Sequence, residues 1–202
     1  MKKHTIRALF LDYGGVIADE GFQNSLREIS REQGLNENAT LQVAKYAVYD
    51  SGFIVGSGTE NDLWKIMRED AGLRGNDDEL SERVLQGFVL RPWMIEQVRI
   101  LRERGYLTGI LSDQSHWLDW LDRRDQFFQY FDYVLNSYHM GKGKRDPALF
   151  AEIAEQLKLL PSEILFVDDM QSNVTRAQSA GWQTIRYVDQ ASFLEELAQY
   201  LE

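Results

Sequence analysis

Carboxylates and one lysine recur at similar places along this chain of 202 residues, each following a short apolar run. Asp12, the pair Ser112-Asp113 and the pair Asp168-Asp169 come directly after such runs, and Lys144 lies beyond another. If these runs form neighbouring strands, three carboxylates would meet, and they would raise one another's pKa unless they shared a cation. Mg²⁺ suits such a cluster because it accepts carboxylate and carbonyl oxygens and pairs with substrate phosphate.

The same residues could carry out a phosphoryl transfer. A carboxylate such as Asp12 can attack phosphorus and form an aspartyl phosphate. Mg²⁺ and Lys144 would offset the charge on the transferring group, and the Ser112 hydroxyl would donate to a phosphate oxygen. Gly14 and Gly15 would let the backbone turn tightly and approach the ligand. We therefore predict Asp12, Ser112 and Lys144 as catalytic residues.

Each of these residues also has a simpler interpretation when it is taken alone. Asp12 could cap a turn, and Asp168-Asp169 could begin a helix, where acidic side chains suit the helix dipole. Asp113 could be an ordinary turn residue. Lys142 lies two residues from Lys144 and one of the two could be merely solvated, but the spacing to Asp146-Pro147 favours Lys144. The functional interpretation rests on the coincidence of all four positions.

Five apolar runs predict the strands that would position these side chains. The runs cover residues 8–11, 106–111, 133–135, 164–167 and 184–187. A helical pattern precedes the second run, since Pro92 suits a first turn and Gly105 a helix end. Strands that alternate with helices predict a doubly wound, Rossmann-like α/β fold with a parallel sheet. Ligands bind at the carboxyl ends of the strands in such sheets, which is where the polar residues fall.

Residues 18–90 interrupt this alternation with helical patterns alone. Four apolar faces recur, around Leu26, Ala44, Leu63 and Val84. The segment from Thr59 to Asp62 has the Thr-x-x-acid form of a helix start. We therefore predict an α/β core of residues 1–17 and 91–202, interrupted by an all-helical insertion of residues 18–90.

Four stretches carry the polar residues, in the order LFLDYGGV (9–16), ILSD (110–113), GKRDPALF (143–150) and FVDDMQSNV (166–174). With these stretches the chain resembles the haloacid dehalogenase (HAD) superfamily, and the resemblance covers nearly the whole chain. It is nearest to a branch of sugar-phosphate phosphatases. The resemblance implies that residues 18–90 are a helical cap domain and that the chain is an enzyme, a phosphoric monoester hydrolase.

The resemblance also implies a Mg²⁺ site. Asp12 would be both the nucleophile and a metal ligand. The main-chain carbonyl of Gly14 and the side chain of Asp169 would complete the protein ligands, and Asp168 would support the metal shell. We therefore expect Asp12, Gly14, Asp168 and Asp169 at the metal.

Substrate binding falls to other residues of the same motifs. By resemblance, Ser112 and Lys144 would hold the phosphate, and we place Asp113 and Gly15 beside them. One position departs from the family pattern. Phosphatases of this family commonly have a second aspartate two residues after the nucleophile, as general acid and base, and here that position is Gly14. Poor leaving groups would then react slowly unless water, Asp19 or a cap residue supplied the proton.

The leading expectation is therefore a Mg²⁺-dependent phosphatase acting on a small phosphorylated metabolite, such as a sugar phosphate. One alternative is a metal-independent 2-haloacid dehalogenase, in which a carboxylate attacks carbon. The acid pair Asp168-Asp169 opposes it, because extra negative charge without Mg²⁺ would repel an anionic substrate. The other alternative is a non-catalytic phosphate-binding relative, which Gly14 makes plausible.

The composition of the chain excludes some kinds of binding partner and some cellular locations. The formal net charge is −10, from 22 Lys and Arg against 32 Asp and Glu, which disfavours nucleic acid. The absence of cysteine excludes disulfides, zinc–thiolate sites and thiol nucleophiles. No apolar run reaches membrane-span length, and the first one meets Asp12 too early for a signal peptide. We expect a cytoplasmic monomer or homodimer with no membrane partner.

Overall fold

The computed structural model describes residues 5–201, so residues 1–4 and residue 202, the two ends of the predicted α/β core, lie outside it. Five parallel strands form one sheet in the order β3-β2-β1-β4-β5. The strands are β1 (Ala8–Leu11), β2 (Leu107–Ser112), β3 (Tyr133–Asn136), β4 (Ile164–Asp168) and β5 (Gln183–Arg186). The predicted parallel α/β fold is confirmed.

Helices fill the connections between the strands. The α-helices are α1 (Gly21–Glu32), α2 (Glu37–Asp50), α3 (Glu60–Ala71), α4 (Asp77–Gly87), α5 (Pro92–Glu103), α6 (Trp117–Asp125), α7 (Ser137–Met140), α8 (Leu149–Leu157), α9 (Gln171–Ser179) and α10 (Gln190–Tyr200). Three short 3₁₀ helices are η1 (Phe53–Val55), η2 (Phe128–Tyr130) and η3 (Pro161–Glu163). None of the helices within residues 5–201 has both the length and the apolar composition that crossing a membrane requires.

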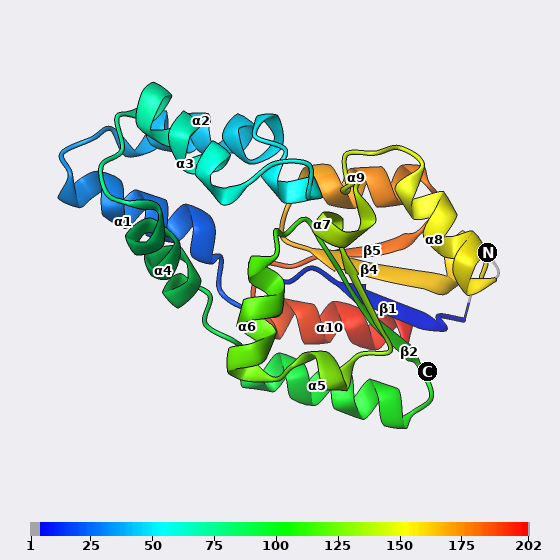
Figure 1. Ribbon diagram of the computed structural model, residues 1–202. Helices are drawn as coiled ribbons and strands as arrows, with labels where there is room; N and C mark the ends of the chain where they lie inside the picture. The colour runs from blue at the N-terminus through cyan, green and yellow to red at the C-terminus, as the bar shows by residue number, and fades with distance from the viewer. Residues whose placement is uncertain (1–4, 202) are drawn as a thin grey trace.

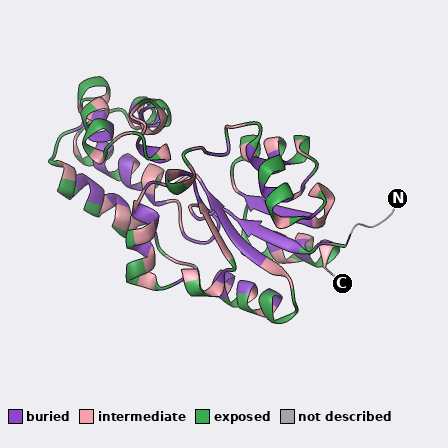
Figure 2. Cartoon of the chain, turned by 45° about the vertical axis from the view of Figure 1, so that its right-hand side comes forward, coloured by how far each residue is buried: buried purple, intermediate pink, exposed green. Residues whose placement is uncertain are grey.

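The sheet is covered on both faces, as Figure 1 shows, with α5 and α10 on one side and α8 and α9 on the other. Every residue of β1 and of β4 is buried, and Figure 2 shows this as continuous purple strands. Successive side chains of β1 enter opposite layers: Leu9 packs in the core that contains α5, and Phe10 packs in the core that contains α8. Strands buried on both faces read as continuous apolar runs, which is why the sequence reveals them.

Helices α1 to α4 connect β1 to β2 and gather beyond one end of the sheet, apart from the other helices (Figure 1). A capping box begins two of them. Thr59 and Asp62 form a capping box at α3, as the sequence pattern indicates, and Asn76 and Glu79 form another at α4. The backbone enters the group of helices α1 to α4 near Ala18 and leaves it near Leu90. These two segments lie side by side, where Ala18 and Leu90 form an antiparallel β-bridge.

Candidate active site

The polar residues of three neighbouring strands meet at the carboxyl edge of the sheet. Leu11, which precedes Asp12, is in register with Ile110 of β2 on one side and with Val167 of β4 on the other. The strand order reverses at β1, because β2 and β3 lie on one side of it and β4 and β5 on the other. A crevice forms at such a reversal in open α/β sheets, and it is their usual ligand site.

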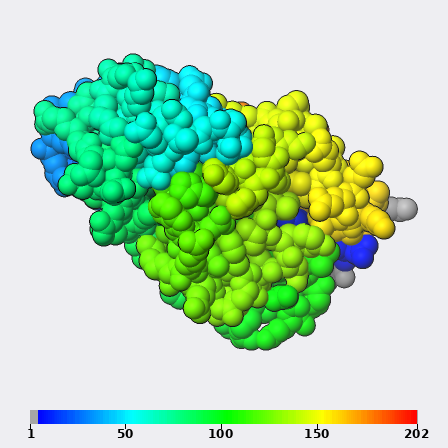
Figure 3. Space-filling view, in the orientation of Figure 1, coloured from blue at the N-terminus to red at the C-terminus, as the bar shows by residue number. Residues whose placement is uncertain are grey.

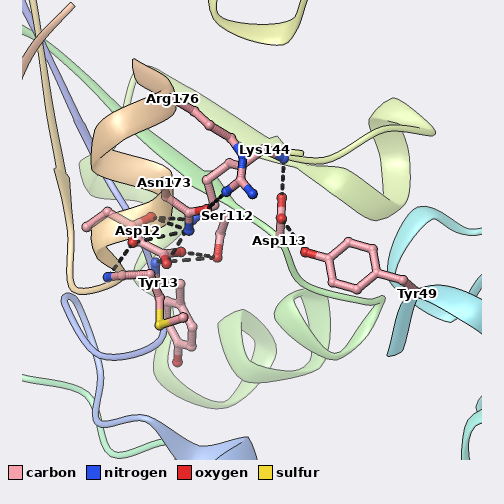
Figure 4. Close-up of polar contacts among 10 residues, drawn as sticks. Asp12, Tyr13, Tyr49, Ser112, Asp113, Lys144, Asn173 and Arg176 are labelled. Atoms are coloured by element: carbon pink, nitrogen blue, oxygen red, sulfur yellow. Dashed lines mark hydrogen bonds and ion pairs between the residues drawn. The ribbon is translucent and has the colours of Figure 1, made fainter. Parts of the chain in front are cut away.

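Asp12 is held by three donors. Its Oδ1 accepts hydrogen bonds from the Tyr13 backbone N–H at 2.7 Å and from the Ser112 hydroxyl at 2.6 Å. Its Oδ2 lies 2.8 Å from the Lys144 ammonium. The predicted catalytic residues Asp12, Ser112 and Lys144 are therefore in direct contact, and the carboxylate has one defined orientation (Figure 4).

Lys144 bridges two acidic residues from inside the protein. It is 1% exposed, and its Nζ donates to Asp168 Oδ2 at 2.6 Å as well as contacting Asp12. Burial disfavours the ammonium, but the charges of Asp12 and Asp168 outweigh it and raise the pKa of Lys144, which therefore stays protonated. Lys142, the alternative from the sequence, instead pairs with Glu152 at the surface.

Asp168 is fully buried, and donors surround its carboxylate. Oδ1 accepts from the Met170 backbone N–H at 2.8 Å and from the Asn173 amide at 3.2 Å. Oδ2 accepts from the same amide at 3.0 Å and from Lys144. Because both carboxylate oxygens already accept hydrogen bonds from the protein, Asp168 is better placed to orient Lys144 and the start of α9 than to give both oxygens to a ligand.

The charges of this cluster fit a divalent cation. One carboxylate oxygen from each of Asp12, Asp168 and Asp169 lies within 4.8 Å of the others. Burial raises the pKa of Asp12, with Lys144 opposing the rise, and burial together with Asp168 raises the pKa of Asp169. Three carboxylates against one ammonium leave two negative charges, and a hard dication would remove this repulsion.

A pocket of about 230 Å³ opens over the cluster. Asp12, Asp113, Lys144 and Asp169 line it from the sheet side, and residues of α1 and α2 line it from the other side. Ser112, Gly15 and Asp168 do not belong to its lining residues. Ser112 therefore acts on Asp12, and its predicted contact with phosphate stays a prediction.

The profile of the haloacid dehalogenase-like hydrolase family matches residues 6–181. The chain belongs to this family. It is thus an enzyme of the hydrolase class, and the resemblance identified from its motifs is confirmed at the level of the superfamily.

Individual proteins are similar to this HAD-like hydrolase over part of their length or at low sequence identity. The mouse protein acyl-CoA dehydrogenase family member 10 is 32% identical over 121 residues, which are 60% of this chain but only 11% of the mouse protein. A HAD family enzyme from Bacteroides thetaiotaomicron, solved with magnesium and inorganic phosphate, superposes with a TM-score of 0.69 at 21% identity, covering 94% of this chain and 98% of that one. The L-2-haloacid dehalogenase RSc1362 superposes equally, with a TM-score of 0.69 at 19% identity over 89% and 85% of the two chains. These structures share the fold.

Gly15 of the HAD-like hydrolase makes room for Asp169. Its φ is +81°, and a Cβ at this position would lie 2.6 Å from the carboxyl carbon of Asp169. Such a distance forces the carboxylate to move. The sequence places Gly15 near substrate, whereas in the structure its immediate neighbour is a candidate metal ligand.

Gly15→Ala is expected to weaken Mg²⁺ binding at least about tenfold, because the new methyl displaces an oxygen ligand. Gly105→Ala is the matched control, since Gly105 has a similar φ of +87°. Apart from its two neighbours in the chain, no residue of the range 5–201 lies within 4 Å of a Cβ at this position. Both variants should lose roughly 1–2 kcal/mol of stability from left-handed backbone strain. Titration calorimetry with Mg²⁺ separates them, and equal affinities would refute the role of Gly15.

Gly14 leaves the usual position of the second aspartate without a side chain. A Cβ there would lie 3.3 Å from the Phe88 ring and 3.5 Å from the Gln114 amide nitrogen, so these two side chains occupy the adjoining space. Asp19, which the sequence offers as a substitute, pairs with Arg91 at 3.0 Å and is absent from the pocket lining.

Several pocket residues escape sequence analysis. Tyr49 of α2 donates to Asp113 Oδ2 at 2.8 Å, and Asp113 Oδ1 accepts from the Lys144 backbone N–H at 2.8 Å. Asp113 thus ties α2 to the lysine loop, as Figure 4 shows. The Arg145 guanidinium lies 3.4 Å from the centre of the Tyr49 ring. Glu20 also lines the pocket, and burial raises its pKa to about 7.

Proposed function

We propose that this HAD-like hydrolase is a Mg²⁺-dependent phosphatase that hydrolyses a small phosphorylated metabolite through an aspartyl phosphate. The observation that carries the proposal is the acidic cluster, in which the oxygens of Asp12, Asp168 and Asp169 converge within 4.8 Å beside a buried lysine. A haloacid dehalogenation needs no metal, so this concentration of negative charge favours phosphate chemistry. The magnesium and phosphate complex of the Bacteroides enzyme, which shares the fold, supports the same assignment.

Asp12 begins the reaction in this proposal. One of its carboxylate oxygens attacks phosphorus, the bond from phosphorus to the leaving oxygen breaks, and a water later attacks the aspartyl phosphate to release phosphate and restore Asp12. Ser112 and the Tyr13 N–H orient the carboxylate, and Lys144 offsets the charge of the phosphoryl oxygens.

The metal would be held by Asp12, Asp169 and the Gly14 carbonyl, with Asp168 supporting the site. When bound, Mg²⁺ supplies charge stabilisation at the phosphoryl oxygens. The side chain of Asp168 orients Lys144, because both of its oxygens accept hydrogen bonds from the protein. We further propose that residues 18–90 act as a cap domain, whose helices α1 and α2 close the pocket and exclude water.

Mg²⁺ is expected to raise the melting temperature of the protein, with about 2.7 kcal/mol of stabilisation at one hundred times its Kd. Asp169→Asn should abolish most of this shift, whereas Asp119→Asn, on helix α6, should retain it. Chelation should also abolish phosphate release from p-nitrophenyl phosphate. Chloride release from a 2-haloacid in the presence of chelator would instead establish the dehalogenase alternative, and Mg²⁺-dependent phosphate binding without turnover would establish a non-catalytic relative.

We propose that Glu20 supplies the proton that Gly14 cannot. Glu20 lies at the start of α1, where its Oε2 accepts from the Gln23 backbone N–H at 2.7 Å, and its side chain lines the pocket with Asp12. As the bond from phosphorus breaks, the Glu20 carboxyl would protonate the leaving oxygen. The resulting carboxylate would then take a proton from the water that attacks the aspartyl phosphate.

Glu20→Gln is expected to slow hydrolysis of an alkyl phosphate by about 10²-fold, because an alkoxide leaves poorly without protonation. In single-turnover measurements the same variant should release p-nitrophenolate within about threefold of the natural rate, since p-nitrophenolate needs no proton to leave, whereas the later hydrolysis of the aspartyl phosphate should slow for both substrates. The two substrates control for any loss of helix capping, which affects both alike. An equal loss in the first-turnover release of the two leaving groups would exclude Glu20 as the proton donor.

A further inference from the structure

A second pocket, of about 120 Å³, adjoins the first between α2, η1 and α6. The two pockets share the lining residues Glu20, Phe22, Val48, Tyr49, Asp113 and Gln114. The two pockets are therefore neighbours along these shared residues, and a molecule with its phosphate at Asp12 has the second pocket within its surroundings. Figure 3 shows the surrounding segments in contact, with the cyan residues near η1 against the green segment that contains α6.

The walls of the second pocket are mostly apolar. They are formed by Phe22, Val48, Phe53, Ile54, Leu63 and Trp117. Five polar residues, Glu20, Tyr49, Asp113, Gln114 and Ser115, also line the pocket, and among them Tyr49, Asp113 and Ser115 already have partners. Tyr49 and Asp113 bond to each other, and the Ser115 hydroxyl accepts from the Trp117 backbone N–H at 3.2 Å.

Contacts within the chain fix the walls of the pocket. The Ser137 hydroxyl donates to the Ile54 carbonyl at 2.7 Å, which fixes η1 on α7. Phe53 packs edge-on against Trp117, with ring centres 5.1 Å apart, so two of the walls support each other. A preformed apolar pocket binds an apolar group without first having to order its walls.

These features argue against a sugar in the second pocket. Each sugar hydroxyl would lose its water and find few free partners on these walls, which is unfavourable. An apolar cavity of similar size, about 150 Å³, accommodates benzene in another protein. The space therefore suits one ring or a short branched chain.

We propose that the second pocket receives the alcohol part of the substrate, and that the substrate is a phosphomonoester of a compact apolar alcohol rather than a sugar phosphate. This substrate class rests on the proposed phosphatase function. It replaces the sugar phosphate that the sequence motifs favour with a class defined by the walls of the pocket.

The test compares the binding of benzylphosphonate and methylphosphonate to the full chain with Mg²⁺ by calorimetry, because phosphonates bind without being hydrolysed. Benzylphosphonate should bind at least about tenfold more tightly, since only its ring reaches the apolar walls. Ile54→Phe, which fills the second pocket alone, should reduce this ratio to about twofold or less. Methylphosphonate affinity should stay unchanged.

A second pair of variants guards against misfolding of Ile54→Phe. Val48→Thr keeps the volume of a half-buried wall residue but adds a hydroxyl, and should lower the ratio several-fold. Val43→Thr is the matched control, because Val43 is also half-buried on α2 and lines neither pocket. If Val48→Thr and Val43→Thr changed the ratio of benzylphosphonate to methylphosphonate affinity equally, the proposal would be overturned.

Hydrolysis distinguishes the two levels of the proposal. Preferred hydrolysis of benzyl phosphate over glucose 6-phosphate supports the substrate class. Hydrolysis of glucose 6-phosphate with no preference for benzylphosphonate would overturn the substrate class alone. Tight binding of benzylphosphonate without hydrolysis of any phosphomonoester would overturn the phosphatase function, and the substrate class with it.

Discussion

Asp12→Asn should reduce phosphatase turnover by at least about 10⁴-fold, because the amide oxygen is a poor nucleophile and no other carboxylate is held in its place. The variant should nevertheless fold. Its Oδ1 can still accept from the Tyr13 N–H and from Ser112, and Lys144, which loses its ion pair with Asp12, keeps the ion pair with Asp168. A loss of activity with an intact structure would identify the missing step as chemistry.

The measurement is the steady-state rate with p-nitrophenyl phosphate, whose activated leaving group needs no general acid. Asp119→Asn is the control, because Asp119 lies on α6, pairs with His139 and lines neither pocket. Mass spectrometry after rapid acid quenching should find phosphate on the natural chain and none on Asp12→Asn. Retention of more than about a tenth of the natural rate would exclude Asp12 as the nucleophile.

Much of the fold was predictable because a buried parallel sheet leaves a strong pattern. Strand β1 matches its predicted run, while β2 and β4 extend one residue further, to Ser112 and Asp168. Those residues look like loop positions because they are polar. In the structure they still pair with neighbouring strands while their side chains enter the polar cluster. The polar residues that the site needs at the ends of these strands are thus the reason why the strand ends were not predicted.

The part of the pocket contributed by the inserted helices was not predictable. Glu20 and Tyr49 belong to no motif, and their positions depend on how α1 and α2 pack beyond the sheet, which local patterns do not determine. The hydrogen-bond partners of Asp113 were equally unpredictable from local patterns. Its type suggested a ligand contact, but both of its oxygens accept hydrogen bonds from distant parts of the chain. Only the tertiary structure reveals such pairings.

Lys144→Met should both inactivate and destabilise the protein. Removing the ammonium leaves Asp12 and Asp168 buried without their cation, and breaking a buried ion pair from one side costs about 3–5 kcal/mol. Activity should fall by at least about 10³-fold, because the phosphoryl charge loses a buried partner. Lys142→Met is the matched control two residues away, where the lysine pairs with Glu152 at the surface and the cost should stay within about 1 kcal/mol.

The destabilisation should depend on pH and on metal in a defined direction. Burial raises the pKa of Asp12 and Lys144 opposes the rise, so in the variant this pKa exceeds the unfolded value by more, and stability is lost as pH rises. The deficit of Lys144→Met relative to the natural chain should therefore be smaller at pH 5 than at pH 8. Because Mg²⁺ also neutralises these carboxylates, adding it should stabilise the variant more than it stabilises Lys142→Met. Denaturant unfolding at both pH values measures these differences, and a deficit that neither pH nor Mg²⁺ alters would show that Lys144 contributes packing rather than charge.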